Sequence, residues 1–207
     1  MATQSVPERR MTAAEYVAFE LASDERHEFH DGRVYPAMGG TRARNRIAGN
    51  VAIRLRESAR GTGCAVFVTA LRTVPDANAH YYPDVVTTCD PADDDAYTVT
   101  APYVVVEVVP AEPERLPVWR KLPRYQATQS VQTVLLVSED ERVVEVRRRN
   151  AEGRFTVHYV IGQGAVELPC PGPPGGPVAM TLDEIYEGAE PPPNAELDPS
   201  DPEPPAR

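Results

Sequence analysis

The segment PYVVVEVVP, residues 102–110, is the feature that most constrains how this chain can fold. A nearly continuous run of valines is typical of a strand that is buried on both faces of a sheet. Glu107 interrupts the run, and an ionised carboxylate inside a buried strand is strongly destabilising unless another group pairs with it. The segment therefore predicts a covered sheet and a specific partner for Glu107.

Helix signals flank this strand on both sides. Thr12 and Glu15 have the spacing of a capping box, and Gly188 is placed to stop a helix. Pro117 suits a first helical turn, whereas Pro123 suits a helix interior poorly. The predicted helices are residues 11–20, 44–60, 117–127 and 181–188.

Strand signals fill the remainder of the chain. Asp31-Gly32 is a favoured turn dipeptide and predicts a hairpin within residues 26–38. Short turns between the later strands favour antiparallel pairing. The further predicted strands are residues 64–74, 81–89, 103–109, 131–137, 142–149, 154–161 and 165–168.

These segments predict one α/β domain over residues 11–188, with a mixed central sheet, helices against it and antiparallel C-terminal strands. Residues 1–10 are expected to be disordered. So are residues 189–207, which are rich in proline and acidic side chains.

Composition limits the partners and the compartment. The net charge of -10 disfavours broad binding to nucleic acid, so any such site must be a local basic patch. No stretch is apolar enough for a membrane helix or a signal peptide, and we expect a cytoplasmic protein. Cys64, Cys89 and Cys170 are far apart and form no CxxC pair, so free thiols are expected.

Acidic residues at strand positions form the candidate site. Asp84 follows Pro83 at the start of one strand, and Glu107 lies in the next strand. Adjacent strands could bring the two carboxylates together, and a divalent cation such as Mg²⁺ or Mn²⁺ would relieve their repulsion. Lys121 is the only lysine in the chain, and its compact ammonium fits a place beside a metal-bound water or a phosphate. Glu28, in the early hairpin, is a further candidate.

Arg44 and Arg46 open the long helix and Arg42 precedes it, and all three are candidate phosphate contacts. Simpler alternatives stay open for every candidate. The acids could pair with arginines or begin strands, Lys121 could be an ordinary surface residue, and the arginines could be a solvated helix start. His27 and His30 could suggest zinc, but residues three apart on a strand face opposite sides.

The order of these motifs resembles the Uma-type restriction endonuclease family of the PD-(D/E)XK nuclease superfamily. The resemblance rests on MTAAEYVAF, RHEFHDGRVY, RNRIAGNVAIRLR, YYPDVVTTCD, PYVVVEVV, RKLPRYQA and LDEIYEG, in that order. It implies a restriction-endonuclease-like fold and metal-dependent hydrolysis of DNA. Asp84 and Glu107 would be metal ligands, Lys121 the catalytic lysine and Glu28 an accessory acid.

The chain departs from the family pattern near the site. Val109 stands where the superfamily motif E-x-K has its lysine, so Lys121 must supply it from the following helix. Arg44 stands where the family often has histidine. Two hypotheses follow: a Mg²⁺-dependent endonuclease, or a degraded nuclease fold that serves as a binding module. A homodimer is expected for the first, since cutting both strands needs two sites.

Overall fold

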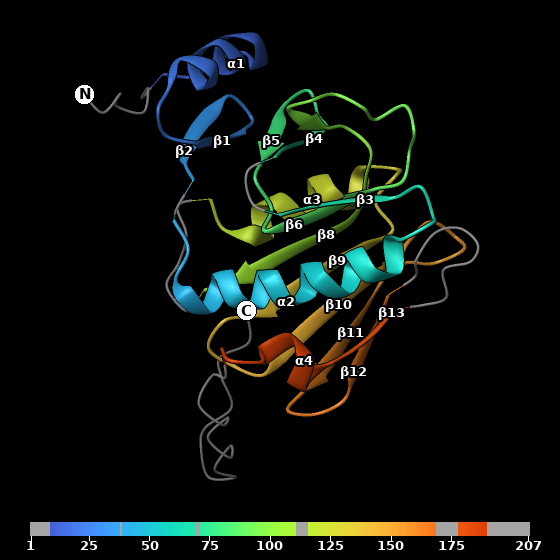
Figure 1. Ribbon diagram of the computed structural model, residues 1–207. Helices are drawn as coiled ribbons and strands as arrows, with labels where there is room; N and C mark the ends of the chain where they lie inside the picture. The colour runs from blue at the N-terminus through green and yellow to red at the C-terminus, as the bar shows by residue number, and fades with distance from the viewer. Residues whose placement is uncertain (1–8, 38, 69–70, 111–115, 169–177, 190–207) are drawn as a thin grey trace.

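The computed structural model describes residues 9–37, 39–68, 71–110, 116–168 and 178–189 (Figure 1). The described residues form four helices and thirteen strands. In chain order they are α1 (Ala13–Ala22), β1 (His27–His30), β2 (Arg33–Pro36), α2 (Arg42–Ala59), β3 (Ala65–Val68), β4 (Arg72–Asp76), β5 (Ala79–Tyr81), β6 (Val85–Thr88), β7 (Thr98–Val99), β8 (Pro102–Val109), α3 (Val118–Ala127), β9 (Thr133–Ser138), β10 (Val143–Arg149), β11 (Phe155–Ile161), β12 (Ala165–Leu168), β13 (Val178–Thr181) and α4 (Leu182–Tyr186).

The central sheet is mixed and has the strand order β11-β10-β9-β8-β6-β3. Strand β8 pairs antiparallel with β6 and parallel with β9, and the other pairs are antiparallel. Alternate valines of β8 enter two different cores. Val104, Val106 and Val108 pack in the core that contains α2 and α4, whereas Val105 packs in the core that contains α3. The predicted burial of this strand is confirmed.

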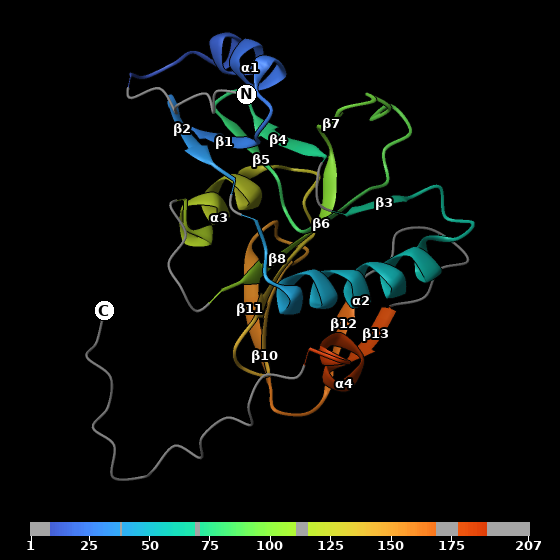
Figure 2. The ribbon, with the colours of Figure 1, turned by 60° about the vertical axis from the view of Figure 1, so that its left-hand side comes forward.

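A smaller sheet, β2-β1-β5-β4-β7, lies on the α3 side, and α1 covers it at the end of the molecule away from α2 (Figure 2). Tyr16 and Phe19 of α1 pack against Phe29 and Val34 of the β1–β2 hairpin. The chain leaves the central sheet after β3, forms β4 and β5 in the small sheet, and returns as β6.

Local signals in the sequence explain the element boundaries. The capping box of Thr12 and Glu15 is present at the start of α1, as predicted. Asp31 and Gly32 have φ values of 48° and 83°, the left-handed pair that a two-residue hairpin turn requires. Helix α3 has Pro117 as its N-cap and contains Pro123, which lies on its exposed side.

Some segments differ from the prediction. Residues 64–74, predicted as one strand, divide into β3 and β4 of different sheets, and residues 81–89 divide likewise into β5 and β6. The sequence analysis also missed β7 and β13, which are short. The disorder predicted for residues 1–8 and 190–207 lies outside the described residues. Within the described ranges, no helix is long and apolar enough to cross a membrane.

The expectation of free thiols is wrong for Cys64 and Cys89, which form a disulfide. Their pairing follows from the sheet register. Ala65 pairs with Thr88 in the antiparallel β3–β6 ladder, so the residues just beyond that pair face each other. Their sequence separation of 25 hides this proximity, because the chain enters the small sheet between them. Cys170 lies outside the described residues.

Candidate active site

The ends of β6 and β8 bring the two predicted acids together. Val85 pairs with Val106, so Asp84 lies opposite Glu107 in the antiparallel register. Asp84 is 4% exposed and Glu107 is 1% exposed. The Oδ2 atom of Asp84 accepts a hydrogen bond of 2.7 Å from the backbone N–H of Val108. The register thus places both carboxylates in the interior, at one end of the central sheet.

Lys121 joins Glu107 to Glu28. Its Nζ donates to Glu28 Oε1 at 2.8 Å and lies 3.3 and 3.4 Å from the two carboxylate oxygens of Glu107. Lys121 is 2% exposed and Glu28 is 6% exposed. A charge this deeply buried is tolerated only where partners compensate it. The three side chains therefore form one buried ionic bridge, and Lys121 is not a surface residue.

Helix α3 supplies two groups to Glu107. Lys121 and Tyr125 are four residues apart, so they lie on the same helix face, and both are buried. The hydroxyl of Tyr125 donates to Glu107 Oε1 at 2.8 Å. Burial, together with the charge of Glu107, raises the pKa of Tyr125 well above its usual value. Tyr125 therefore stays protonated and acts as a hydrogen-bond donor. The sequence analysis missed it, although its spacing from Lys121 could have indicated it.

The segment between β5 and β6 connects Glu28 with Asp84. The backbone N–H of Tyr82 donates to Glu28 Oε1 at 3.1 Å, and Asp84 lies two residues further along the chain. The carboxylate of Glu28 thus contacts both α3 and the connection that enters the central sheet. Glu28 comes from the small sheet, so the cluster lies where the two sheets meet (Figure 1).

A second layer of polar side chains surrounds Lys121. Its Nζ lies 5.8 Å from the ring centroid of Tyr81, and the hydroxyl of Tyr81 lies 2.6 Å from His30 Nδ1. Burial lowers the pKa of His30 and raises the pKa of Tyr81, so both side chains are held uncharged near neutral pH. His27 instead contacts Glu20, at 3.2 Å. The two histidines therefore have separate partners.

The three predicted arginines have different surroundings. Arg44 donates through Nε to Asp84 Oδ1 at 2.8 Å, so it is an ion-pair partner of the candidate site. Arg42 and Arg46 are exposed and line a surface hollow of about 520 Å³ along α2. The structure therefore separates Arg44 from the other two.

The donor set suits a hard divalent cation. Asp84 and Glu107 offer only oxygen atoms, and the five charged side chains of the cluster carry a formal charge of -1, from three carboxylates against Lys121 and Arg44. Among the described residues, no group of three or more His, Cys, Asp or Glu is arranged to hold a metal. Mg²⁺ commonly uses one or two carboxylates and keeps several waters, so two protein ligands are sufficient.

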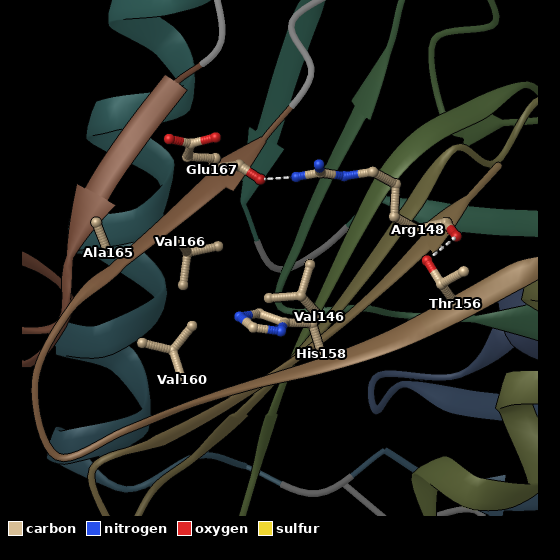
Figure 3. Close-up of a pocket in the computed structure, with 8 residues that line it drawn as sticks. All are labelled: Val146, Arg148, Thr156, His158, Val160, Ala165, Val166 and Glu167. Carbon is tan, nitrogen blue, oxygen red and sulfur yellow. Dashed lines mark hydrogen bonds between the residues drawn. The ribbon is translucent and has the colours of Figure 1, made fainter.

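Another surface hollow, of about 320 Å³, lies between the β10–β11 pair and β12 (Figure 3). Val146, Val160 and Val166 are among its lining residues, and Arg148 donates to the backbone oxygen of Glu167 beside it. His158 also lines it. None of the residues of the carboxylate cluster takes part in this hollow, so it is separate from the candidate site.

Comparisons with known proteins bear on the family and the fold. A model of the family Uma2, described as "Putative restriction endonuclease", matches residues 13–179. The uncharacterized proteins slr1290 and sll1609 of Synechocystis sp. are 27% and 24% identical to this chain over 187 and 159 residues. These alignments cover 89% and 75% of this chain, and 95% and 90% of the two relatives.

A solved structure supports the fold. It is described as a "putative nuclease belonging to DUF820" from Anabaena variabilis and superimposes with a TM-score of 0.66 at 14% sequence identity. The match covers 87% of this chain and 99% of that chain. At this identity the likeness bears on the fold alone. Since the family model spans most of the described sequence, the chain belongs to the Uma2 family of restriction endonuclease-like proteins, and its fold is that of a nuclease.

Proposed function

We propose that this protein is a metal-dependent endonuclease that hydrolyses phosphodiester bonds of DNA. The observation that carries the proposal is the buried contact of Lys121 with Glu107 and Glu28, directly beside Asp84 in the sheet register. A purely structural core has no need of three carboxylates and a lysine, because apolar residues of similar volume are usually at least as stabilising.

Each residue has a role that its position supports. Asp84 and Glu107 would hold Mg²⁺ or Mn²⁺ through their carboxylate oxygens. When bound, the cation would activate a water for attack on phosphorus and stabilise the developing charge. Lys121 would orient the attacking water and offset negative charge, and Glu28 would hold the ammonium in position from the small sheet. Tyr125 would fix one oxygen of Glu107.

Arg44 has a separate role in the proposal. Its guanidinium compensates Asp84 in the absence of a metal, at 2.8 Å. A cation on Asp84 would compete with that ion pair, because one carboxylate cannot fully compensate both. Displacement of Arg44 toward a scissile phosphate would keep the guanidinium paired, since arginine binds phosphate well.

A second candidate function is a nuclease fold that binds without cutting. The Arg44–Asp84 ion pair favours it, because a tethered cation already occupies one proposed ligand. The low exposure of Asp84, Glu107 and Lys121 favours it too.

Nicking of supercoiled plasmid in Mg²⁺ or Mn²⁺ separates the two candidates. Wild type is expected to cut, and Asp84→Asn is expected to lose activity. Asp94→Asn, at an exposed position between β6 and β7, serves as the matched control. If no protein cuts in either metal, the binding module is favoured. Equal cutting by wild type and Asp84→Asn would mean that Asp84 is not a ligand.

The proposal extends to assembly and location. Cutting both strands of a duplex requires two sites, so we propose a homodimer, which sedimentation equilibrium would test. We also propose that the protein acts in the cytoplasm, where its proposed substrate, DNA, is accessible.

A further inference from the structure

The outer side of α3 carries the only tryptophan of the chain, and this side chain is 62% exposed. Trp119 lies two residues before Lys121, on the opposite side of the helix from the buried ionic bridge. It lines a surface hollow of about 420 Å³, whose other lining residues come from α3, the β1–β2 hairpin and the segment before α1. That volume falls within the range of small-ligand sites, roughly 300–1,000 Å³.

The hollow is basic, although the whole chain is acidic. Three exposed arginines line it: Arg10 before α1, Arg33 of β2 and Arg120 of α3. The lining acid, Asp31, is ion-paired with Arg124, which also pairs with Asp76, so the three lining arginines still outnumber it. Three separate segments thus bring guanidinium groups to one place on a chain with a net charge of -10. Such a local patch is what binding to a polyanion requires here.

The hollow also offers an aromatic surface. The guanidinium carbon of Arg120 lies 5.1 Å from the centre of the Trp119 ring, and Tyr35 lines the same hollow. Exposed aromatic rings beside arginines are the arrangement by which proteins bind unpaired bases, since each base can stack on a ring while its phosphate contacts a cation. A duplex offers phosphates but keeps its bases stacked inside, so it would leave Trp119 unused.

The hollow is close to the carboxylate cluster. His30 lines it and is bonded to Tyr81, whose ring lies 5.8 Å from Lys121 Nζ. His30 is also two residues from Glu28 on β1, so both side chains project to the same side of that strand. His30 and Tyr81 therefore connect the hollow with the proposed catalytic lysine.

We propose that this hollow is the substrate subsite for an unpaired nucleotide. The base stacks on Trp119, and Arg10, Arg33 and Arg120 bind the flanking phosphates. The assignment of this nucleotide to the substrate rests on the proposed nuclease function, whereas binding itself does not. The proposed subsite favours single-stranded or splayed DNA over a continuous duplex.

Trp119 provides the test, because intrinsic tryptophan fluorescence reports on this hollow alone. The full-length protein, in EDTA, is titrated with a 20-mer of thymidylate and with a duplex of equal length. We expect saturable quenching by the single strand, at least fivefold tighter than by the duplex and weakened by raising the salt. Arg33→Gln and Arg120→Gln are expected to weaken binding at least fivefold each. Arg154→Gln removes the same charge from an exposed position near β11 and is the control.

A labelled 20-mer followed by anisotropy extends the test to Trp119 variants. Trp119→Ala is expected to bind at least tenfold more weakly, and Trp119→Phe is expected to retain most of the affinity because it keeps an aromatic face. Equal losses in Arg154→Gln and Arg33→Gln would overturn the proposal, as would equal binding of duplex and single strand. A fluorescence shift that depends on protein concentration without DNA would assign the hollow to a second copy instead.

The plasmid assay separates this proposal from the nuclease function. Cutting by wild type without any quenching by the oligonucleotide would leave the function standing and remove the hollow from substrate binding. Specific quenching without cutting in either metal would support the nucleotide site and count against the endonuclease.

Discussion

At the scale of single residues, Lys121 illustrates how a buried charge depends on its neighbours. The ammonium lies between two carboxylates that come from different sheets, and all three groups are nearly inaccessible. Removal of one member leaves the others uncompensated, which is the most destabilising change that such a bridge can undergo.

Lys121→Met is therefore expected to lower the free energy of unfolding by about 3–5 kcal/mol. The double variant Lys121→Met/Glu107→Gln is expected to recover part of this loss, because it removes one of the two carboxylates that Lys121→Met leaves without a cation. Urea unfolding at pH 7 measures both. Arg56→Met, at an exposed position of α2, should stay within about 0.5 kcal/mol of wild type. Wild-type stability in Lys121→Met would show that the bridge does not compensate Glu107.

Arg44 gives a prediction about metal affinity. Arg44→Gln removes the cation that pairs with Asp84, so Mn²⁺ is expected to bind about tenfold more tightly, a difference of about 1.4 kcal/mol. Electron paramagnetic resonance of free Mn²⁺ measures the affinity without any substrate. Arg42→Gln, on the same helix turn but exposed, is the control. Unchanged affinity in Arg44→Gln would mean that the ion pair and the metal do not compete.

His80 gives a prediction about pH. Burial, assisted by the charge of Arg72, lowers its pKa from 6.5 to about 4. Between these two pH values His80 is protonated in the unfolded chain but not in the folded chain. The free energy of unfolding is therefore highest above pH 6.5 and decreases as the pH falls toward 4. Between pH 7 and 5 the loss is expected to be about 2 kcal/mol.

His80 lies beside the rings of Tyr16 and Phe29, at centroid distances of 5.0 and 5.7 Å, so an aromatic replacement can occupy its place. His80→Phe is expected to show a smaller decrease in stability between pH 7 and 5, measured by urea unfolding at both pH values. The same pH dependence in both proteins would assign the effect to other groups.

At the scale of elements, the sequence predicted helices and long strands well because their signals are local. The capping box, the Asp31-Gly32 turn and the valine run each act over a few residues. Asp84 beside Glu107 was also predictable, because consecutive segments of a sheet commonly pair. The division of residues 64–74 between two sheets was not predictable, because the spacing of apolar residues does not indicate which sheet a strand joins. The Cys64–Cys89 pair was missed for the same reason.

The disulfide makes its own prediction. It closes a loop with a sequence separation of 25 residues, and a loop of that length is expected to add about 3 kcal/mol to stability. The variant Cys64→Ser/Cys89→Ser should therefore unfold at lower urea than oxidised wild type. In dithiothreitol the two proteins should unfold at similar urea concentrations. A difference that persists under reduction would indicate that the serines disturb the β3–β6 ladder by packing.

At the scale of the whole molecule, we propose residues 11–188 as the folding unit. The three described cores lie within this range apart from Ala189, which packs against one of them. A chain of residues 9–189 is therefore expected to melt within a few degrees of the full chain. Differential scanning calorimetry measures this, and a large decrease in melting temperature would show that the terminal residues contribute to stability.

Composition could not have located the basic hollow, because its arginines come from separate segments.

The position of the cluster between two sheets has a consequence for synthesis. Glu28, Asp84, Glu107 and Lys121 meet only after β1, β6, β8 and α3 have all assembled. A chain still leaving the ribosome has no complete cluster until α3 has emerged and packed. An enzyme of the proposed kind would thus be inactive on the DNA of its own cell until α3 has been made and packed, and a copy terminated before α3 would lack Lys121 and be inert.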